Sequence, residues 1–239
     1  MIDVNDSQAL LRSELQARSE EGCDVAAVVK QIEGMDEAGS TGANAAGLLD
    51  VLAELEPAPD FAYVEPTELA AIQAARPADR PGPFAPPDDR LDRILGGWLG
   101  RSAGCLLGKP VESLARADIV AYLEAAGEYP LTRYFPLLEP NPLDRSLHRS
   151  AGESTRGNIE CMPRDDDIDY MLIALHILET YGREYTAADV GREWLLLLPF
   201  HQVFTAERAA YKNLVDGVLP PLTATTRNPY REWIGAQIR

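Results

Sequence analysis

Apolar residues recur along most of the chain at the three- and four-residue spacing of one helix face. No stretch alternates apolar and polar residues over the length of a half-buried strand, so we expect an all-α protein. The spacing predicts a helix that begins at Pro66 and others over residues 7–33, 48–55, 91–106, 115–126, 166–181, 186–198 and 205–215.

Prolines divide the predicted helices into two groups. Five of them lie between residues 76 and 90, a composition typical of a linker: Pro77, Pro81, Pro83, Pro86 and Pro87. We therefore expect a small helical N-terminal appendage over residues 1–75, a linker over residues 76–90 and a main helical domain over residues 91–239. The appendage is too short to bury much core alone, so we expect it to pack on the main domain. Residues 128–164 contain four more prolines and no sustained period, which predicts a long loop of a functional or flexible kind.

Four glycines recur every fourth residue in the predicted helix before Pro110: Gly96, Gly100, Gly104 and Gly108. In a helix they form one narrow stripe, and each interior glycine costs about 1 kcal/mol relative to alanine. Close approach of another helix, or of a ligand, to the bare backbone would offset that cost. Glu112 follows the helix end, where the helix dipole disfavours a carboxylate, so a nearby cation or substrate hydroxyl would stabilise it.

Three adjacent carboxylates, Asp165, Asp166 and Asp167, open the predicted helix over residues 166–181. The residues that follow are apolar on nearly every face, which predicts a buried helix whose first turn is held against the core. Oxygen ligands fixed in this way select hard cations such as Mg²⁺, Mn²⁺ or Ca²⁺. The alternative is an acidic N-terminal cap whose side chains are solvated.

Acidic residues outnumber basic residues by 38 to 22, which gives a net charge of −16. Such a surface repels phosphate backbones and anionic lipid, so we expect neither nucleic acid nor a membrane as partner. Arg145, Arg149 and Arg156 in the long loop are candidates for contacts with the phosphates of a small ligand. The three cysteines form no CxxC pair and the N-terminus has no apolar signal-peptide core, so we expect a cytoplasmic protein.

Two segments together resemble motifs of the ADP-ribosylglycohydrolase family. Residues 100–112, GRSAGCLLGKPVE, match a G-x-x-x-G…G-x-P-x-E pattern at the end of that family's first helix. Asp165-Asp166-Asp167-Ile168 takes the position of the family's Thr-Asp-Asp-Thr metal motif at the start of an apolar helix. The resemblance extends over residues 90–239 and implies an all-α, orthogonal multi-helix bundle. It also implies a two-metal Mg²⁺ or Mn²⁺ centre that binds the ribose of ADP-ribose.

The resemblance implies a reaction and gives roles to residues. The reaction is hydrolysis of the glycosidic bond between ADP-ribose and a protein side chain or small acceptor, so the expected partner is an ADP-ribosylated protein or an ADP-ribose-containing small molecule. Asp165, Asp166 and Asp167 are the expected metal ligands, and Glu112 and Asp166 the expected catalytic groups. The expected substrate contacts are Gly108, Arg149 and Arg156. Metal ions would lower the pKa of a bound water, whose proton a carboxylate can take, while the ribosyl carbon gains oxocarbenium character.

The chain departs from the family pattern in three ways. Cys105 stands where the family often has Asp, and Asp165 and Ile168 replace the two threonines. The family's second Asp-rich motif is missing, since only the isolated Asp189 and Asp216 follow residue 182. We therefore expect the N-terminal part of a longer protein. Two alternatives remain: a non-catalytic module that binds ADP-ribose or another nucleotide, and a structural helical module.

Overall fold

The computed structural model describes residues 3–38, 42–79, 82 and 87–237. The chain divides into two compact units, Met1–Arg80 with Ile173–Arg239 and Pro81–Leu172. No strand occurs within these described ranges, apart from an isolated bridge between Cys23 and Pro57, so the protein is all-α as predicted. Among the described helices, none combines the length and the apolar character needed to cross a bilayer.

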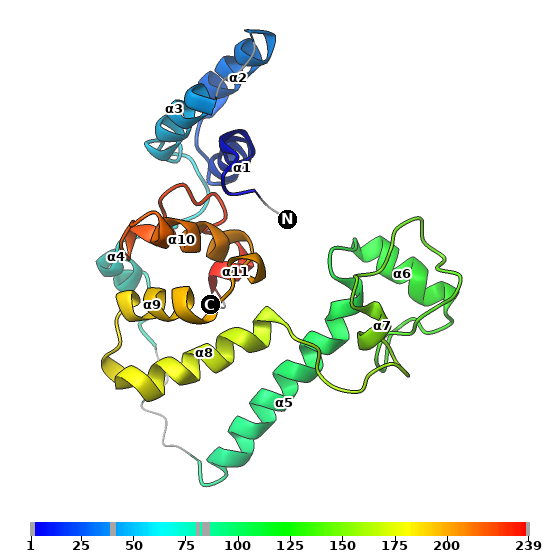
Figure 1. Cartoon of the computed structure of the whole chain (residues 1–239). Helices are drawn as coiled ribbons and strands as arrows, with labels where there is room; N and C mark the ends of the chain where they lie inside the picture. The colour runs from blue at the N-terminus through cyan, green and yellow to red at the C-terminus, as the bar shows by residue number, and fades with distance from the viewer. Residues whose placement is uncertain (1–2, 39–41, 80–81, 83–86, 238–239) are drawn as a thin grey trace. The chain divides into compact units, whose positions relative to one another are not determined.

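The first unit joins the two ends of the chain. Its N-terminal helices are α1 (Ser7–Glu20), α2 (Ala26–Ala38), α3 (Gly42–Ala53) and α4 (Leu69–Ala74). Its C-terminal helices are α9 (Ala187–Leu197), α10 (Thr205–Val215) and α11 (Ile234–Gln237), with short 3-10 turns at η2 (Gly182–Glu184), η3 (Phe200–Gln202) and η4 (Leu222–Ala224). Helix α1 packs against α3, and α10 packs against α9 (Figure 1).

One hydrophobic core joins these N- and C-terminal segments. Leu10, Leu49 and Leu52 from α1 and α3 cluster with Ala206 of α10 and with Tyr230. The N-terminal residues therefore share a core with residues 173–239 and form one unit with them. The predicted division at residues 76–90 contains the boundary between Arg80 and Pro81, and the second boundary, after Leu172, has no sequence signal. Residues 80, 81 and 83–86 of the predicted linker lie outside the described residues.

Ion pairs reinforce the same junction. Arg231 donates to both carboxylate oxygens of Glu14 at 3.1 and 3.0 Å and to Glu21 at 2.8 Å. Arg18 contacts the same two carboxylates at 3.1 and 2.9 Å. The side chains of Glu14 and Arg231 are only 7% and 15% exposed. Burial lowers the pKa of Arg231, but the two glutamates outweigh this effect and raise it, so the guanidinium stays charged.

The predicted continuous helix over residues 7–33 is wrong, because the chain breaks between α1 and α2. Gly22 adopts a φ of +81°, a left-handed conformation that glycine accepts without strain. The ring of Phe61 also occupies the space that a side chain at this position would need. Cys23 then forms an isolated antiparallel β-bridge with Pro57, so a contact with a distant residue replaces the hydrogen bonds of a continuous helix.

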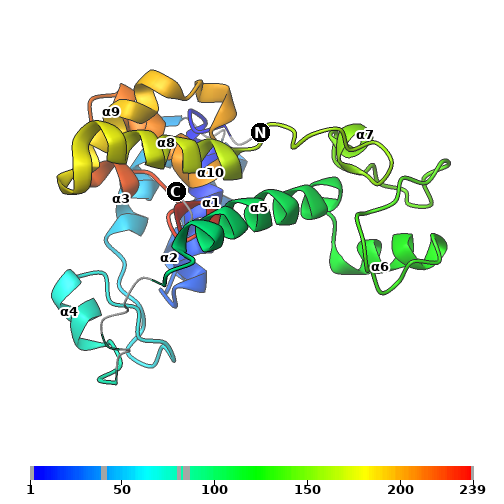
Figure 2. The ribbon, with the colours of Figure 1, turned by 90° about the horizontal axis from the view of Figure 1, so that it is seen from below.

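The second unit contains α5 (Arg90–Gly108), the 3-10 turn η1 (Lys109–Val111), α6 (Arg116–Ala125) and α7 (Ala151–Ser154). Figure 2 shows α5 as a long helix whose C-terminal end leads into the region of α6 and α7. Tyr122 of α6 packs on Phe135, and its hydroxyl donates to the carbonyl of Pro136 at 3.3 Å and accepts from the amide of Leu138 at 2.7 Å. The long loop predicted over residues 128–164 is thus anchored on α6 and is irregular except for α7.

Helix α8 (Asp166–Tyr181) has the predicted bounds but not the predicted burial. Tyr170, Ile173 and Ile177 are buried, whereas Leu172 and Leu175 are 53% and 46% exposed. A helix that is apolar on every side is therefore covered on one side only. A capping box opens α9: Thr186 accepts from the amide of Asp189, and the Asp189 carboxylate accepts from the amide of Thr186.

Candidate functional site

The C-terminal part of α5 and the start of α8 meet within the second unit. Arg101, Cys105 and Lys109 are spaced four residues apart, so they lie along one face of the helix and its continuation. The Lys109 ammonium donates to the Asp165 carboxylate, and Arg101 Nε donates to the main-chain oxygen of Asp167 at 2.8 Å. These contacts join segments that are 56 and 66 residues apart. The two sequence segments singled out above therefore form one local cluster.

Asp165 acts as the N-terminal cap of α8. Its Oδ1 accepts from the amide of Asp167 at 3.0 Å, and its carbonyl accepts from the amides of Ile168 and Asp169 at 3.1 and 3.0 Å. The side chain of Asp165 is 12% exposed, so this first carboxylate of the acidic segment is largely shielded from solvent. Burial raises the pKa of Asp165, but the hydrogen bonds from Lys109 and the Asp167 amide outweigh burial and hold this pKa below its usual range.

Lys109 is the cation that the acidic start of α8 requires, and no local sequence pattern predicts its role. Its side chain is 8% exposed. Burial lowers the pKa of Lys109, yet its hydrogen bond to Asp165 and the charge of that carboxylate raise it overall. Both members of the pair are therefore ionised at neutral pH. The adjacent Arg101 guanidinium lies 3.8 Å from the Asp167 carboxylate and adds a second positive charge.

Cys105 completes a group of three potential metal-binding side chains. Its sulfur and one oxygen each from Asp165 and Asp167 lie within 4.8 Å of one another, the only such group of three or more in the described part of the chain. Burial, followed by the charge of Asp165, raises the pKa of the Cys105 thiol to about 12. The thiol is therefore protonated at neutral pH and is neither a nucleophile nor a ligand for a hard cation.

These residues fit one divalent ion and do not fit a pair. Mg²⁺ and Mn²⁺ are commonly held by one or two carboxylates together with water molecules. Asp165 and Asp167 can provide the two carboxylates. Lys109 already neutralises Asp165, so an ion must replace its ammonium there. A second ion needs further oxygen ligands, and the group identified in the described residues contains none. Asp166, the first residue of α8, is half-buried and lies outside this group.

Glu112 lies just beyond η1, as its sequence position predicts. Its side chain is 61% exposed, and its carboxylate is 3.6 Å from Nε2 of His148. Lys109 is close enough for the charge of Glu112 to raise the lysine pKa. The carboxylate predicted to need a positive neighbour thus has a lysine close enough to interact with its charge.

The residues expected to contact the substrate, Gly108, Arg149 and Arg156, form no hydrogen bond or ion pair with Lys109 or Asp165 among the described residues. Both nitrogens of the Arg156 fork donate to the Glu128 carboxylate, and the Arg156 amide donates to the carbonyl of Phe135 at 2.8 Å. Arg156 is therefore committed to the anchoring of the long loop. Arg149 is exposed. An added Cβ at Gly108 would meet no atom within 4 Å.

The rest of the glycine stripe is equally open. Added Cβ atoms at Gly96, Gly100 and Gly104 would also meet no described atom within 4 Å. Comparison with models of known protein families, with curated proteins and with solved structures found no match to this chain.

Proposed function

We propose that this chain is a metal-dependent hydrolase of the ADP-ribosylglycohydrolase type, which cleaves the glycosidic bond between ADP-ribose and a protein side chain or small acceptor. One observation supports the proposal most directly. The segment that ends α5 and the acidic segment that starts α8 are the two that carry the sequence resemblance, and they contact each other through Lys109 and Asp165. The same proposal includes an orthogonal bundle arrangement and a Mg²⁺ or Mn²⁺ cofactor.

Each residue has a definite task in this proposal. Asp165 and Asp167 hold one divalent ion after Lys109 leaves Asp165, and Asp166 is the proposed further ligand. A bound ion supplies positive charge that orients ribose hydroxyls and lowers the pKa of a water molecule. Glu112, exposed and beside His148, is the group available to accept a proton from that water. Arg149 offers a guanidinium for the diphosphate, since it is exposed at the surface of the long loop.

The direct test measures free ADP-ribose released from arginine- and serine-ADP-ribosylated protein, with Mn²⁺, with Mg²⁺ and with EDTA. We expect release that requires the metal and falls about 100-fold or more in Glu112→Gln and in Asp167→Asn. Asp60→Asn removes an exposed carboxylate in the other unit and serves as the matched control, with unchanged release. Release that persists in EDTA, or that neither site variant alters, contradicts the proposal.

A structural role for the cluster is the second candidate, and the buried Lys109–Asp165 pair favours it. The lysine ammonium and the amide of Asp167 already satisfy the cap, so α8 can begin at this point without a metal ion. In that case ADP-ribosylated protein is not a substrate, and the pair serves to fix α8 on α5. The two candidates predict different Mn²⁺ affinities when Lys109 is replaced by methionine.

A further inference from the structure

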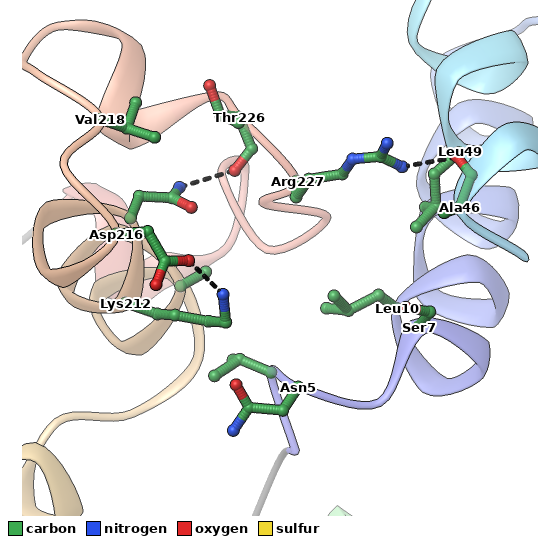
Figure 3. Close-up of a pocket in the computed structure, with 13 residues that line it drawn as sticks. Asn5, Ser7, Leu10, Ala46, Leu49, Lys212, Asp216, Val218, Thr226 and Arg227 are labelled. Atoms are coloured by element: carbon green, nitrogen blue, oxygen red, sulfur yellow. Dashed lines mark hydrogen bonds and ion pairs between the residues drawn. The ribbon is translucent and has the colours of Figure 1, made fainter. Parts of the chain in front are cut away.

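A cavity of about 390 Å³ lies within the first unit, apart from the acidic cluster of the second unit. Helices α1 and α3, with the residues before α1, form one wall, and α10 with the loop after it forms the other (Figure 3). Its volume is in the range of sites that enclose small ligands. None of the residues discussed for hydrolysis lines it.

The wall formed by α1 and α3 is largely aliphatic, with Ser7 as its polar residue. Leu10 and Leu49 are 7% and 4% exposed and belong to the hydrophobic core of the unit, so core packing fixes their positions. Ala46 lies beside them on α3 (Figure 3). This wall suits a branched aliphatic group, because it offers apolar surface and no aromatic ring for stacking.

The opposite wall carries paired charges. Lys212 and Asp216 are one turn apart on α10, and the lysine ammonium contacts the Asp216 carboxylate (Figure 3). Their side chains are 32% and 49% exposed, so both groups can be reached by a ligand. An ammonium beside a carboxylate disfavours a simple anion and a simple cation alike, but it complements a ligand that carries both charges. The exposed pair itself is weak, so a ligand can exchange for it.

Asn213 adds a fixed acceptor on the same wall. The residue is 6% exposed, and its amide nitrogen donates to the carbonyls of Thr223 and Thr226 at 2.9 and 2.6 Å. Its amide oxygen accepts no hydrogen bond from the residues that the structure describes, although Asn213 lines the cavity. An amide oxygen whose nitrogen is held in this way favours a ligand that donates hydrogen bonds.

We propose that this cavity binds a free α-amino acid with an aliphatic side chain. Lys212 receives the ligand carboxylate, Asp216 and the Asn213 oxygen receive its ammonium group, and the side chain lies on Leu10 and Leu49. The proposal explains why one wall combines the Lys212 ammonium with two oxygen acceptors. Arg227, the second cation in the lining, is already hydrogen-bonded to Asp50 and to the carbonyl of Ala46. It is independent of the hydrolase activity, since the cavity and the acidic cluster share no residue.

Titration calorimetry on the intact chain tests this with L-leucine and two truncated analogues. We expect saturable binding of leucine at one site per chain. The analogue without the ammonium group, 4-methylpentanoate, and the analogue without the carboxylate, 3-methylbutylamine, should bind about tenfold more weakly or worse. No saturable binding of leucine, or equal binding of either analogue, overturns the proposal. Tighter binding of an uncharged sugar such as glucose overturns it as well.

Variants locate the binding. Lys212→Met and Asp216→Asn should each weaken leucine binding about tenfold, while Arg183→Met, an exposed cation that does not line the cavity, should leave it unchanged. Ala46→Leu fills the cavity and should abolish binding. Leucine affinity that survives in an Ala46→Leu protein with wild-type melting overturns the proposal. If that variant does not fold, the analogue series on the wild-type chain still decides.

Discussion

Two buried ion clusters join distant parts of this chain, and they differ in the cation that each uses. In the first unit Arg231 forks between Glu14 and Glu21, with Arg18 on the same carboxylates. In the second unit the single ammonium of Lys109 neutralises Asp165. A planar guanidinium binds carboxylates through several fixed bonds, whereas an ammonium is a compact point charge. The arginine cluster is therefore suited to hold the two ends of the chain together. In the lysine cluster, another cation can replace the ammonium of Lys109.

The largest effect should come from the arginine cluster. Arg231→Met leaves Glu14 almost buried with only Arg18 as its counter-ion, so the free energy of unfolding should fall by about 3 kcal/mol. Urea denaturation measures this, and Arg12→Met, an exposed cation on the same helix α1, is the control that should change little. A loss no greater than that of the control would show that the cluster does not fasten the ends of the chain.

Lys109→Met in the presence of EDTA should have the next largest effect. Asp165 loses its counter-ion but keeps the hydrogen bond from the Asp167 amide, so we expect a loss of about 2 kcal/mol. Arg93→Met removes an exposed cation from α5 whose partner is also exposed, and should cost less than about 1 kcal/mol. Equal losses in both variants would mean that burial of the Lys109 pair contributes nothing.

A third buried carboxylate, that of Glu193, should make the stability of the first unit depend on pH. Glu193 accepts from Tyr181 at 2.6 Å and contacts His176 at 3.1 Å, and its side chain is 7% exposed. The Tyr181 hydrogen bond, followed by the contact with His176, outweighs burial and lowers the pKa of Glu193. A depressed folded-state pKa gives stability that is present above the unfolded pKa of about 4.3 and is lost as the pH falls through the folded value.

Glu193→Gln should therefore melt at a lower temperature than wild type at pH 7, and the difference should shrink between pH 5 and pH 3. Thermal melting followed by circular dichroism at each pH measures it. Tyr181→Phe should reproduce part of the loss, because it removes the strongest hydrogen bond to the carboxylate. A difference that grows on acidification contradicts the assigned direction of the pKa shift.

The smallest expected effect concerns the thiol inside the lysine cluster. With a pKa of about 12, Cys105 stays protonated at pH 8 and should resist iodoacetamide, whereas the exposed Cys161 should be alkylated first. Mass spectrometry of the digested protein measures both rates. Asp165→Asn should make Cys105 more reactive, because it removes the negative charge that raises the thiol pKa. Rapid alkylation of Cys105 in the wild-type protein would contradict the raised pKa of its thiol.

Local signals predicted the elements of the fold well. Apolar spacing placed α5, α8 and α10 nearly to the residue, and the Thr186–Asp189 capping box marks the start of α9. The break at Gly22 depends on the ring of Phe61, far along the chain, so the spacing alone predicted one helix where two form.

The candidate site shows the same division. The sequence singled out Asp165, Asp166 and Asp167 from their position before an apolar helix, and Asp165 and Asp167 lie together in the group with Cys105. It pointed to Cys105 only as a departure from the family pattern, and it gave no indication of Lys109, whose partner is 56 residues away. The pairing of Glu14 with Arg231, 217 residues apart, was equally beyond local pattern. Charged residues are predictable one by one, but their partners depend on tertiary packing.

Calorimetric titration of Mn²⁺ into the wild-type chain and into Lys109→Met tests most directly whether the lysine cluster is a metal site. If Lys109 holds the place of an ion, Mn²⁺ should bind the wild-type chain, bind Lys109→Met about tenfold more tightly, and lose its binding in Asp167→Asn. Absence of binding heat in all three proteins, or equal affinity of the wild type and Lys109→Met, would contradict the account and leave the cluster as a fastening of α8 to α5.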